Sequence, residues 1–84
     1  MKATSIYTDR HHPNNYIAKM EDGSYKFVTA ALNGVFGAMK AEVFEARLKS
    51  RTWDGAPTAA EVVGPEGRIL LATLNASLAA ESGH

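Results

Sequence analysis

Two turn signals constrain the fold of this chain more than any other feature of its sequence. The first, Asp22-Gly23, is flanked by alternating apolar and polar residues over 16–21 and 24–29. A tight hairpin turn needs residues that accept positive φ, and Asp-Gly is a preferred pair for a two-residue turn. The sequence therefore predicts an antiparallel hairpin that reverses at Asp22-Gly23.

The second signal, Asn33-Gly34, predicts another reversal, after which 35–40 returns along the preceding strand. The alternative is one long helix over 30–51. Gly34 and Gly37 would each cost such a helix about 1 kcal/mol, which favours the hairpin. The expected strands are 3–8, 16–21, 24–32 and 35–40.

Helix formers dominate the second half of the chain. A helix is expected over 42–51, where basic residues gather near the C-terminal end, as the helix dipole favours. A closing helix is expected over 68–80, where leucines recur at helical spacing. Between them, 58–61 has the spacing of a capping box. The segment 62–74 is open to two interpretations, a hairpin or a loop that leads into the closing helix.

The length of 84 residues allows one small domain, 1–84, with one modest core. No apolar run approaches the roughly 18 residues of a membrane span, and no signal-peptide pattern is present. We therefore expect a cytoplasmic protein. The predicted strands and helices together give an α+β domain, a four-stranded antiparallel sheet with two helices packed on one face.

Two-residue turns fix which side chains share a face of the predicted sheet, because residues two apart in a strand point the same way. Met20 then lies opposite Tyr25, and Ala18 lies opposite Phe27. One face is rich in aromatic side chains and contains Tyr16, Ala18, Met20, Tyr25, Phe27, Thr29 and Phe36. The other face is aliphatic and contains Ile17, Lys19, Lys26, Val28, Ala30, Leu32, Val35 and Met39.

Two helices cover only one face of such a sheet, so the other face meets solvent or a partner. The β-branched residues of the aliphatic face suit helix packing, and aromatic residues and methionine are enriched at recognition surfaces. The alternative is an aromatic core with a solvated aliphatic face, which carries Lys19 and Lys26. These lysines, opposite each other in this register, either guard a sheet edge or contact an anionic partner. The candidate partner-binding residues are Tyr7, Tyr16, Met20, Tyr25, Phe27, Phe36, Lys19 and Lys26.

Side chains for catalysis or metal binding are sparse. The chain has no cysteine, and the adjacent His11 and His12 point apart on an extended chain, so we expect no metal site. The segment 64–67 favours a turn rather than a phosphate-binding loop. Trp53 is interpreted as a lid over one end of the core. We expect no enzymatic activity and no cofactor.

The order of these segments resembles that of one known family. An opening strand with Tyr7 and the turn pairs Asp22-Gly23 and Asn33-Gly34 are followed by Gly55-Ala56-Pro57 and a last helix after Gly67-Arg68. In this layout the chain resembles small phage anti-CRISPR proteins that act on type I-F surveillance complexes. The resemblance spans most of the chain and contains few identical residues.

The resemblance implies a non-enzymatic inhibitor in an infected bacterial host. Family members attach to the Cas7-type backbone subunits and block pairing of target DNA with the guide, through tyrosines on an exposed sheet face. Tyr7 matches one such position, whereas Met20 stands where the family has a tyrosine. This leading interpretation involves a protein partner, no membrane and no direct nucleic-acid contact.

Two alternatives to the inhibitor remain. Aromatic side chains on an open sheet also bind single-stranded nucleic acid, by stacking on its bases. Nine basic and nine acidic side chains give zero formal charge, which counts against this alternative. The other alternative is a small structural or assembly protein that self-associates through the same apolar face.

Overall fold

A computed structural model describes residues 1–11 and 15–82 of the chain. Its elements in chain order are β1 (Ala3–Asp9), β2 (Tyr16–Met20), β3 (Tyr25–Val28), β4 (Val35–Met39), α1 (Ala41–Lys49), β5 (Ala59–Glu61) and α2 (Gly64–Ser82). The strands form one antiparallel sheet in the order β4-β3-β2-β1-β5. The α+β class is confirmed, but the sheet has five strands rather than the four expected.

The additional strand, β5, occupies the segment that was expected to cap a helix. Asp9 pairs with Ala59 and Tyr7 pairs with Glu61, while the Val62 N–H donates to the Ile6 carbonyl at 2.9 Å. Alanine and glutamate have weak strand preference. Pairing with β1, rather than local preference, therefore makes this segment a strand, and the predicted capping box over 58–61 is wrong.

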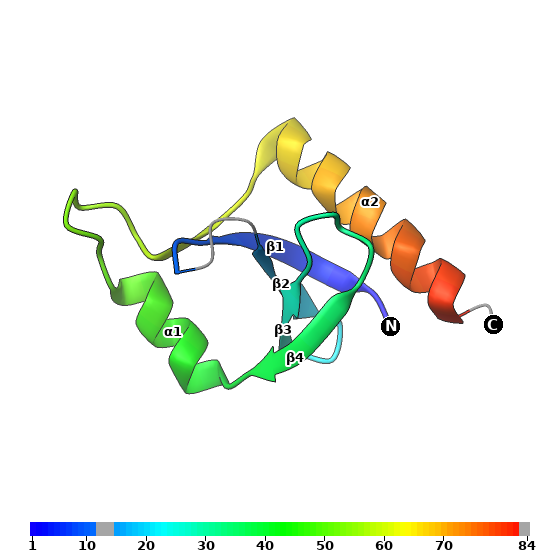
Figure 1. Cartoon of the computed structure of the whole chain (residues 1–84), viewed down its shortest axis with the longest axis horizontal. Helices are drawn as coiled ribbons and strands as arrows, with labels where there is room; N and C mark the ends of the chain where they lie inside the picture. Colours follow the sequence, from blue (N-terminus) through cyan, green and yellow to red (C-terminus); the bar gives the residue numbers. More distant parts are fainter. Residues whose placement is uncertain (12–14, 83–84) are drawn as a thin grey trace.

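The two helices lie on opposite sides of the sheet (Figure 1). On one side, Leu74 and Leu78 of α2 pack in a cluster with Ala18 of β2. On the other side, Phe44 of α1 packs in a second cluster with Ile17 of β2. The expectation that both helices pack on one face is wrong. Because each face has its own helix, the adjacent Ile17 and Ala18 are both completely buried.

The turn between β2 and β3 contains one residue more than expected. The Met20 N–H donates to the Ser24 carbonyl at 2.8 Å, and Gly23 has a φ of 86°. Lys19 therefore lies opposite Tyr25, and Ile17 lies opposite Phe27. A shift of one residue in the pairing moves every side chain of one strand to the opposite face of the sheet, relative to the side chains of its partner strand.

The predicted aromatic face is therefore divided between the two sides of the sheet. Tyr7, Tyr25 and Phe27 pack against the cluster under α1, whereas Tyr16 and Met20 belong to the cluster under α2. Lys19 lies on the α1 side and Lys26 on the α2 side, because Lys26 pairs with Ala18. The two lysines are not opposite each other, which corrects the predicted pairing.

The third strand ends at Val28, four residues earlier than expected. Val28 pairs with Val35, and 29–34 forms a loop closed by the Thr29 N–H, which donates to the Gly34 carbonyl at 3.2 Å. Leu32 adopts a φ of 58° in this loop and packs against the cluster under α2. The predicted reversal, in preference to a helix over 30–51, is confirmed.

The segment 62–74 is a short connection followed by helix, because α2 begins at Gly64 rather than at residue 68. Pro65 fits the first turn of a helix, where its missing N–H is not needed. The backbone of Gly67 lies so close to Val62 that an added Cβ would be 2.1 Å from the Val62 carbonyl oxygen. Glycine at this position therefore allows α2 to start directly after β5.

Candidate functional site

Aromatic rings under α1 pack against one another and form part of the core. The Phe44 ring stacks on the Tyr25 ring, with centroids 4.0 Å apart and an angle of 15° between the planes. The Tyr7 ring meets Phe44 edge to face, with a centroid distance of 4.8 Å. Both tyrosines are half-buried. Much of their ring surface is therefore used inside the domain.

The position of Tyr7 at the edge of this cluster changes the pKa of its phenol. Burial raises its pKa, and the neighbouring Glu61 carboxylate and Tyr25 raise it further. A hydrogen bond with Ser5 acts in the opposite direction and is the smallest of these effects. Tyr7 is therefore a neutral hydrogen-bonding group at physiological pH.

A buried ion pair ties α1 to the sheet. The Arg47 guanidinium donates from Nη1 to the Asp9 carboxylate at 2.9 Å, and the Asp9 side chain is completely buried. Asp9 also accepts a hydrogen bond from the His11 backbone N–H at 3.0 Å. The Arg47 guanidinium lies 6.0 Å from the centre of the Phe27 ring. Both carboxylate oxygens of Asp9 therefore accept hydrogen bonds from within the domain.

The eight candidate partner-binding residues do not form one surface. Only Phe36, on the edge strand β4, is exposed, at 46%, and its ring stacks on Phe27 with centroids 5.6 Å apart. Met20 is buried. The others are half-buried, namely Tyr7, Tyr16, Lys19, Tyr25, Lys26 and Phe27.

Trp53 is the most exposed large apolar residue among those that the structure describes. Its side chain is 99% exposed at the tip of the loop between α1 and β5. Tryptophan is normally well buried in folded proteins because it carries a large apolar ring. The interpretation of Trp53 as a lid over the core is therefore wrong, and no local pattern in the sequence distinguishes an exposed tryptophan from a buried one.

Backbone and side-chain hydrogen bonds hold the loop that carries Trp53. The Thr52 N–H donates to the Ala56 carbonyl at 2.7 Å, and the Gly55 N–H donates to the Thr52 carbonyl at 2.9 Å. The Asp54 carboxylate accepts from the Thr52 hydroxyl and from the Ala56 N–H. The loop is thus closed on itself on both sides of Trp53.

The Asp54 carboxylate has a lowered pKa. Its hydrogen bond from the Thr52 hydroxyl is the largest cause, followed by the bond from the Ala56 N–H, with a smaller contribution from Arg10. Arg10 is joined to the base of the loop, because its N–H donates to the Thr58 carbonyl at 2.9 Å. Arg10 and Arg51 are both exposed, and Arg10 is close enough to the Asp54 carboxylate to contribute to its lowered pKa.

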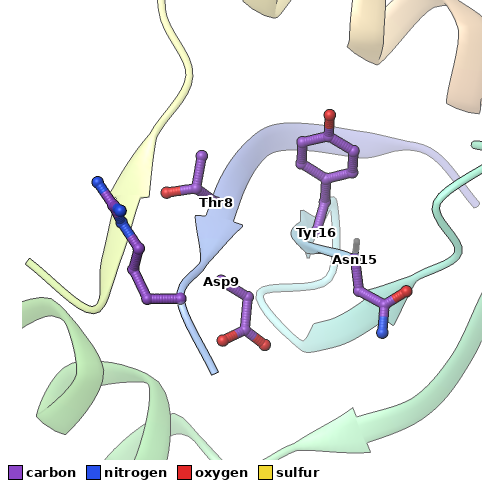
Figure 2. Close-up of a pocket in the computed structure, with 5 residues that line it drawn as sticks. Thr8, Asp9, Asn15 and Tyr16 are labelled. Carbon is purple, nitrogen blue, oxygen red and sulfur yellow. The ribbon is translucent and has the colours of Figure 1, made fainter. Parts of the chain in front are cut away.

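A small cavity of about 270 Å³ lies beside the end of β1 (Figure 2). Figure 2 shows Tyr16 and Asp9 pointing in opposite directions from their strands. The Asp9 carboxylate is already paired with Arg47. The polar groups around this cavity therefore do not converge on one point, as a catalytic site would require. Its lining residues are Thr8, Asp9, Arg10, Asn15 and Tyr16.

Within residues 1–11 and 15–82, no group of three His, Asp or Glu side chains is close enough to hold a metal ion. His11 is exposed, and the adjacent His12, which was expected to point away from it, lies outside the described residues. In the same part of the chain, neither helix is long and apolar enough to span a membrane.

No protein-family model, curated protein or solved structure matches this chain.

Proposed function

We propose that this protein is a non-enzymatic protein-binding domain that inhibits a larger assembly, of the kind represented by the anti-CRISPR proteins that act on type I-F surveillance complexes. Its partner would be the Cas7-type backbone of such a complex, and binding would block recognition of target DNA. The observation that carries the binding function is the exposure of Trp53 on an internally hydrogen-bonded loop.

An exposed tryptophan supports binding because of what it contributes to protein interfaces. Tryptophan is among the residues most enriched in binding hot spots, where it fills a pocket of the partner and excludes water. A ring that is 99% exposed has almost all of its surface available for burial. The hydrogen bonds around Trp53 already restrict the loop, which lowers the conformational entropy lost on binding.

This proposal moves the main contact away from the tyrosines of the sheet. Tyr25 is stacked on Phe44, and Tyr7 is in edge-to-face contact with the same ring, so neither can leave the core without a loss of packing. Phe36 is the one predicted contact residue that is exposed, and it offers a secondary contact on the edge strand β4.

The proposal is tested by titrating the purified chain into a type I-F surveillance complex and measuring its affinity for double-stranded target DNA. We expect the chain to bind the complex and to reduce DNA binding, and we expect Trp53→Ala to lose most of this effect. Val63→Ala is the matched control, because Val63 is 71% exposed and lies outside the loop, between β5 and α2. Absence of binding by the unaltered chain would refute inhibition of this complex.

A second candidate function is favoured by the cations near Trp53. The exposed Trp53 ring could stack on a base, while Arg51 of the same loop and Arg10 at its base could contact phosphates. Binding to a single-stranded oligonucleotide that weakens steeply with salt would favour this function. Salt-insensitive or absent binding would favour the protein partner.

A further inference from the structure

Three residue pairs of this chain have the sequence at which a backbone nitrogen most readily attacks a side chain. In this reaction, the nitrogen of one residue attacks the side-chain carbonyl carbon of the asparagine or aspartate before it, and a five-membered succinimide ring forms. Glycine at the second position leaves the nitrogen unhindered because it has no Cβ. The three pairs are Asp22-Gly23, Asn33-Gly34 and Asp54-Gly55.

The two aspartate pairs are held in turns that oppose this reaction. In both, the glycine N–H donates to the backbone carbonyl three residues before it, at 2.9 Å. Hydrogen bonds from Ser24 lower the pKa of Asp22, and a hydrogen bond from the Thr52 hydroxyl is the largest cause of the lowered pKa of Asp54. Both groups are therefore carboxylates at neutral pH, and a carboxylate resists attack by a nucleophile.

The Asn33-Gly34 pair has neither of these constraints. Gly34 contributes its carbonyl oxygen to the loop between β3 and β4, where it accepts from the Thr29 N–H at 3.2 Å. Among the described residues 29–34, the Gly34 N–H donates none of the hydrogen bonds that close the loop. Asn33 has an uncharged amide side chain and is exposed to solvent. Its side-chain carbonyl is therefore open to attack.

A hydroxyl group activates the Asn33 amide. The Thr29 hydroxyl donates to Oδ1 of Asn33 at 2.7 Å, and the Asn33 N–H donates to the same hydroxyl oxygen at 3.3 Å. A donor on a carbonyl oxygen stabilises the negative charge that develops on this oxygen when a nucleophile attacks the carbon. Thr29 is therefore placed to favour attack on Cγ of Asn33.

We propose that Asn33 is a site of spontaneous deamidation, at which the loop between β3 and β4 converts its own asparagine to aspartate and isoaspartate. The Gly34 nitrogen forms a bond to Cγ of Asn33 and loses its proton, while the Cγ–Nδ2 bond breaks and ammonia leaves. Water then opens the succinimide ring. Attack of water at one ring carbonyl gives aspartate, and attack at the other gives isoaspartate.

Deamidation changes both the charge and the backbone of the loop where it meets α2. Each product adds one negative charge to a chain whose formal charge is zero. The Glu81 carboxylate of α2 is close to the loop, since its Oε1 lies 3.3 Å from the position of a Cβ added to Gly34. Isoaspartate also lengthens the main chain by one carbon atom directly after Leu32, which packs against the cluster under α2.

Storage of the purified full chain in mildly alkaline buffer, followed by peptide mass spectrometry, tests the proposal. We expect a gain of one mass unit at residue 33, with isoaspartate as one of the two products. Asn75 is the internal control, because alanine follows it and its side chain is bound to the Ala3 N–H at 2.8 Å and to the Ala3 carbonyl at 3.0 Å. Asn75 should remain unmodified.

Two variants identify the route of the reaction. Gly34→Ala should slow the modification at least severalfold, because a side chain at residue 34 hinders the approach of its nitrogen. Asn33→Gln should give no product on the same time scale, because attack would form a larger ring. Thermal melts verify that both variants remain folded. Equal rates of modification in the unaltered chain and in Gly34→Ala would overturn attack by the Gly34 nitrogen.

Comparison with the chain unfolded in guanidinium chloride tests the role of the structure. Residue 33 should react at comparable rates in the folded and the unfolded chain, whereas isoaspartate at residues 22 and 54 should form only in the unfolded chain. A residue 33 that stays unmodified in the folded chain while it reacts in the unfolded chain would overturn the proposal. Isoaspartate that forms first at residue 22 or 54 of the folded chain would also overturn it.

Discussion

The ring of Phe44 lies on the ring of Tyr25, with centroids 4.0 Å apart and planes at 15° to each other. This contact joins α1 to the sheet and covers part of the Tyr25 ring. Phe44 is only 2% exposed and also contacts Tyr7. The Phe44 ring therefore limits how much of Tyr7 and Tyr25 remains available to a partner.

Replacement of Phe44 should destabilise the domain strongly. We expect Phe44→Ala to lower the free energy of unfolding by about 3–5 kcal/mol, the usual range for a large buried aromatic residue. Urea denaturation measures the change. Val43→Ala, at a neighbouring position that is 43% exposed, should change stability by less than about 0.5 kcal/mol. Equal effects of the two substitutions would show that α1 does not pack as described.

Removal of Asp9 should leave a charge without its partner. The Asp9 carboxylate is fully buried and the Arg47 side chain is 18% exposed, so Asp9→Ala should cost about 3–5 kcal/mol, as for other broken buried ion pairs. A double-mutant cycle with Arg47→Ala isolates the interaction between the two groups. Additive effects of the two substitutions would mean that the ion pair does not contribute to stability.

Replacement of Leu74 tests the packing on the other face. Leu74 of α2 is completely buried between the helix and the sheet, and Leu74→Ala should destabilise the domain by about 2–5 kcal/mol. Ile69→Ala, on the outward side of the same helix, should change stability by less than about 0.5 kcal/mol. A neutral Leu74→Ala would place α2 away from the sheet.

The Trp53 loop should respond to acid because Asp54 accepts hydrogen bonds from Thr52 and Ala56. The pKa of Asp54 is lowered in the folded chain, so these bonds persist above its unfolded pKa and are lost as the pH falls through the lower, folded value. We expect the Ala56 amide signal in NMR spectra to titrate below the ordinary aspartate range. Asp54→Asn should abolish this titration, and an ordinary midpoint would contradict the described loop.

The main elements of the fold follow from local sequence signals, but the faces of the sheet do not. Asp22-Gly23 marks a turn in either register, because glycine provides the positive φ for a two-residue or a three-residue turn. The observed turn adds one residue, and that residue reverses the orientation of Tyr16, Ala18 and Met20 relative to β3. The alternation of apolar and polar residues in the two strands is the same for either turn, so it does not show whether the turn has two or three residues.

The strand β5 and the exposure of Trp53 depend on tertiary contacts. Ala59–Glu61 is a strand because β1 offers a free edge, and the sequence of the segment shows no strand preference. Trp53 is exposed because Thr52, Asp54 and Ala56 close the loop on themselves. Without the path of the loop, the sequence does not show whether its tryptophan is exposed or buried.

The affinity of the surveillance complex for Trp53→Ala, compared with that for Tyr7→Ala, tests the central proposal most directly. We expect Trp53→Ala to reduce affinity by about 2 kcal/mol or more, roughly 30-fold, with an unchanged melting midpoint. Tyr7→Ala should instead lower the melting midpoint, because its ring packs on Phe44. Full affinity of Trp53→Ala, together with a stable Tyr7→Ala that no longer binds, would contradict the account and return the binding surface to the sheet.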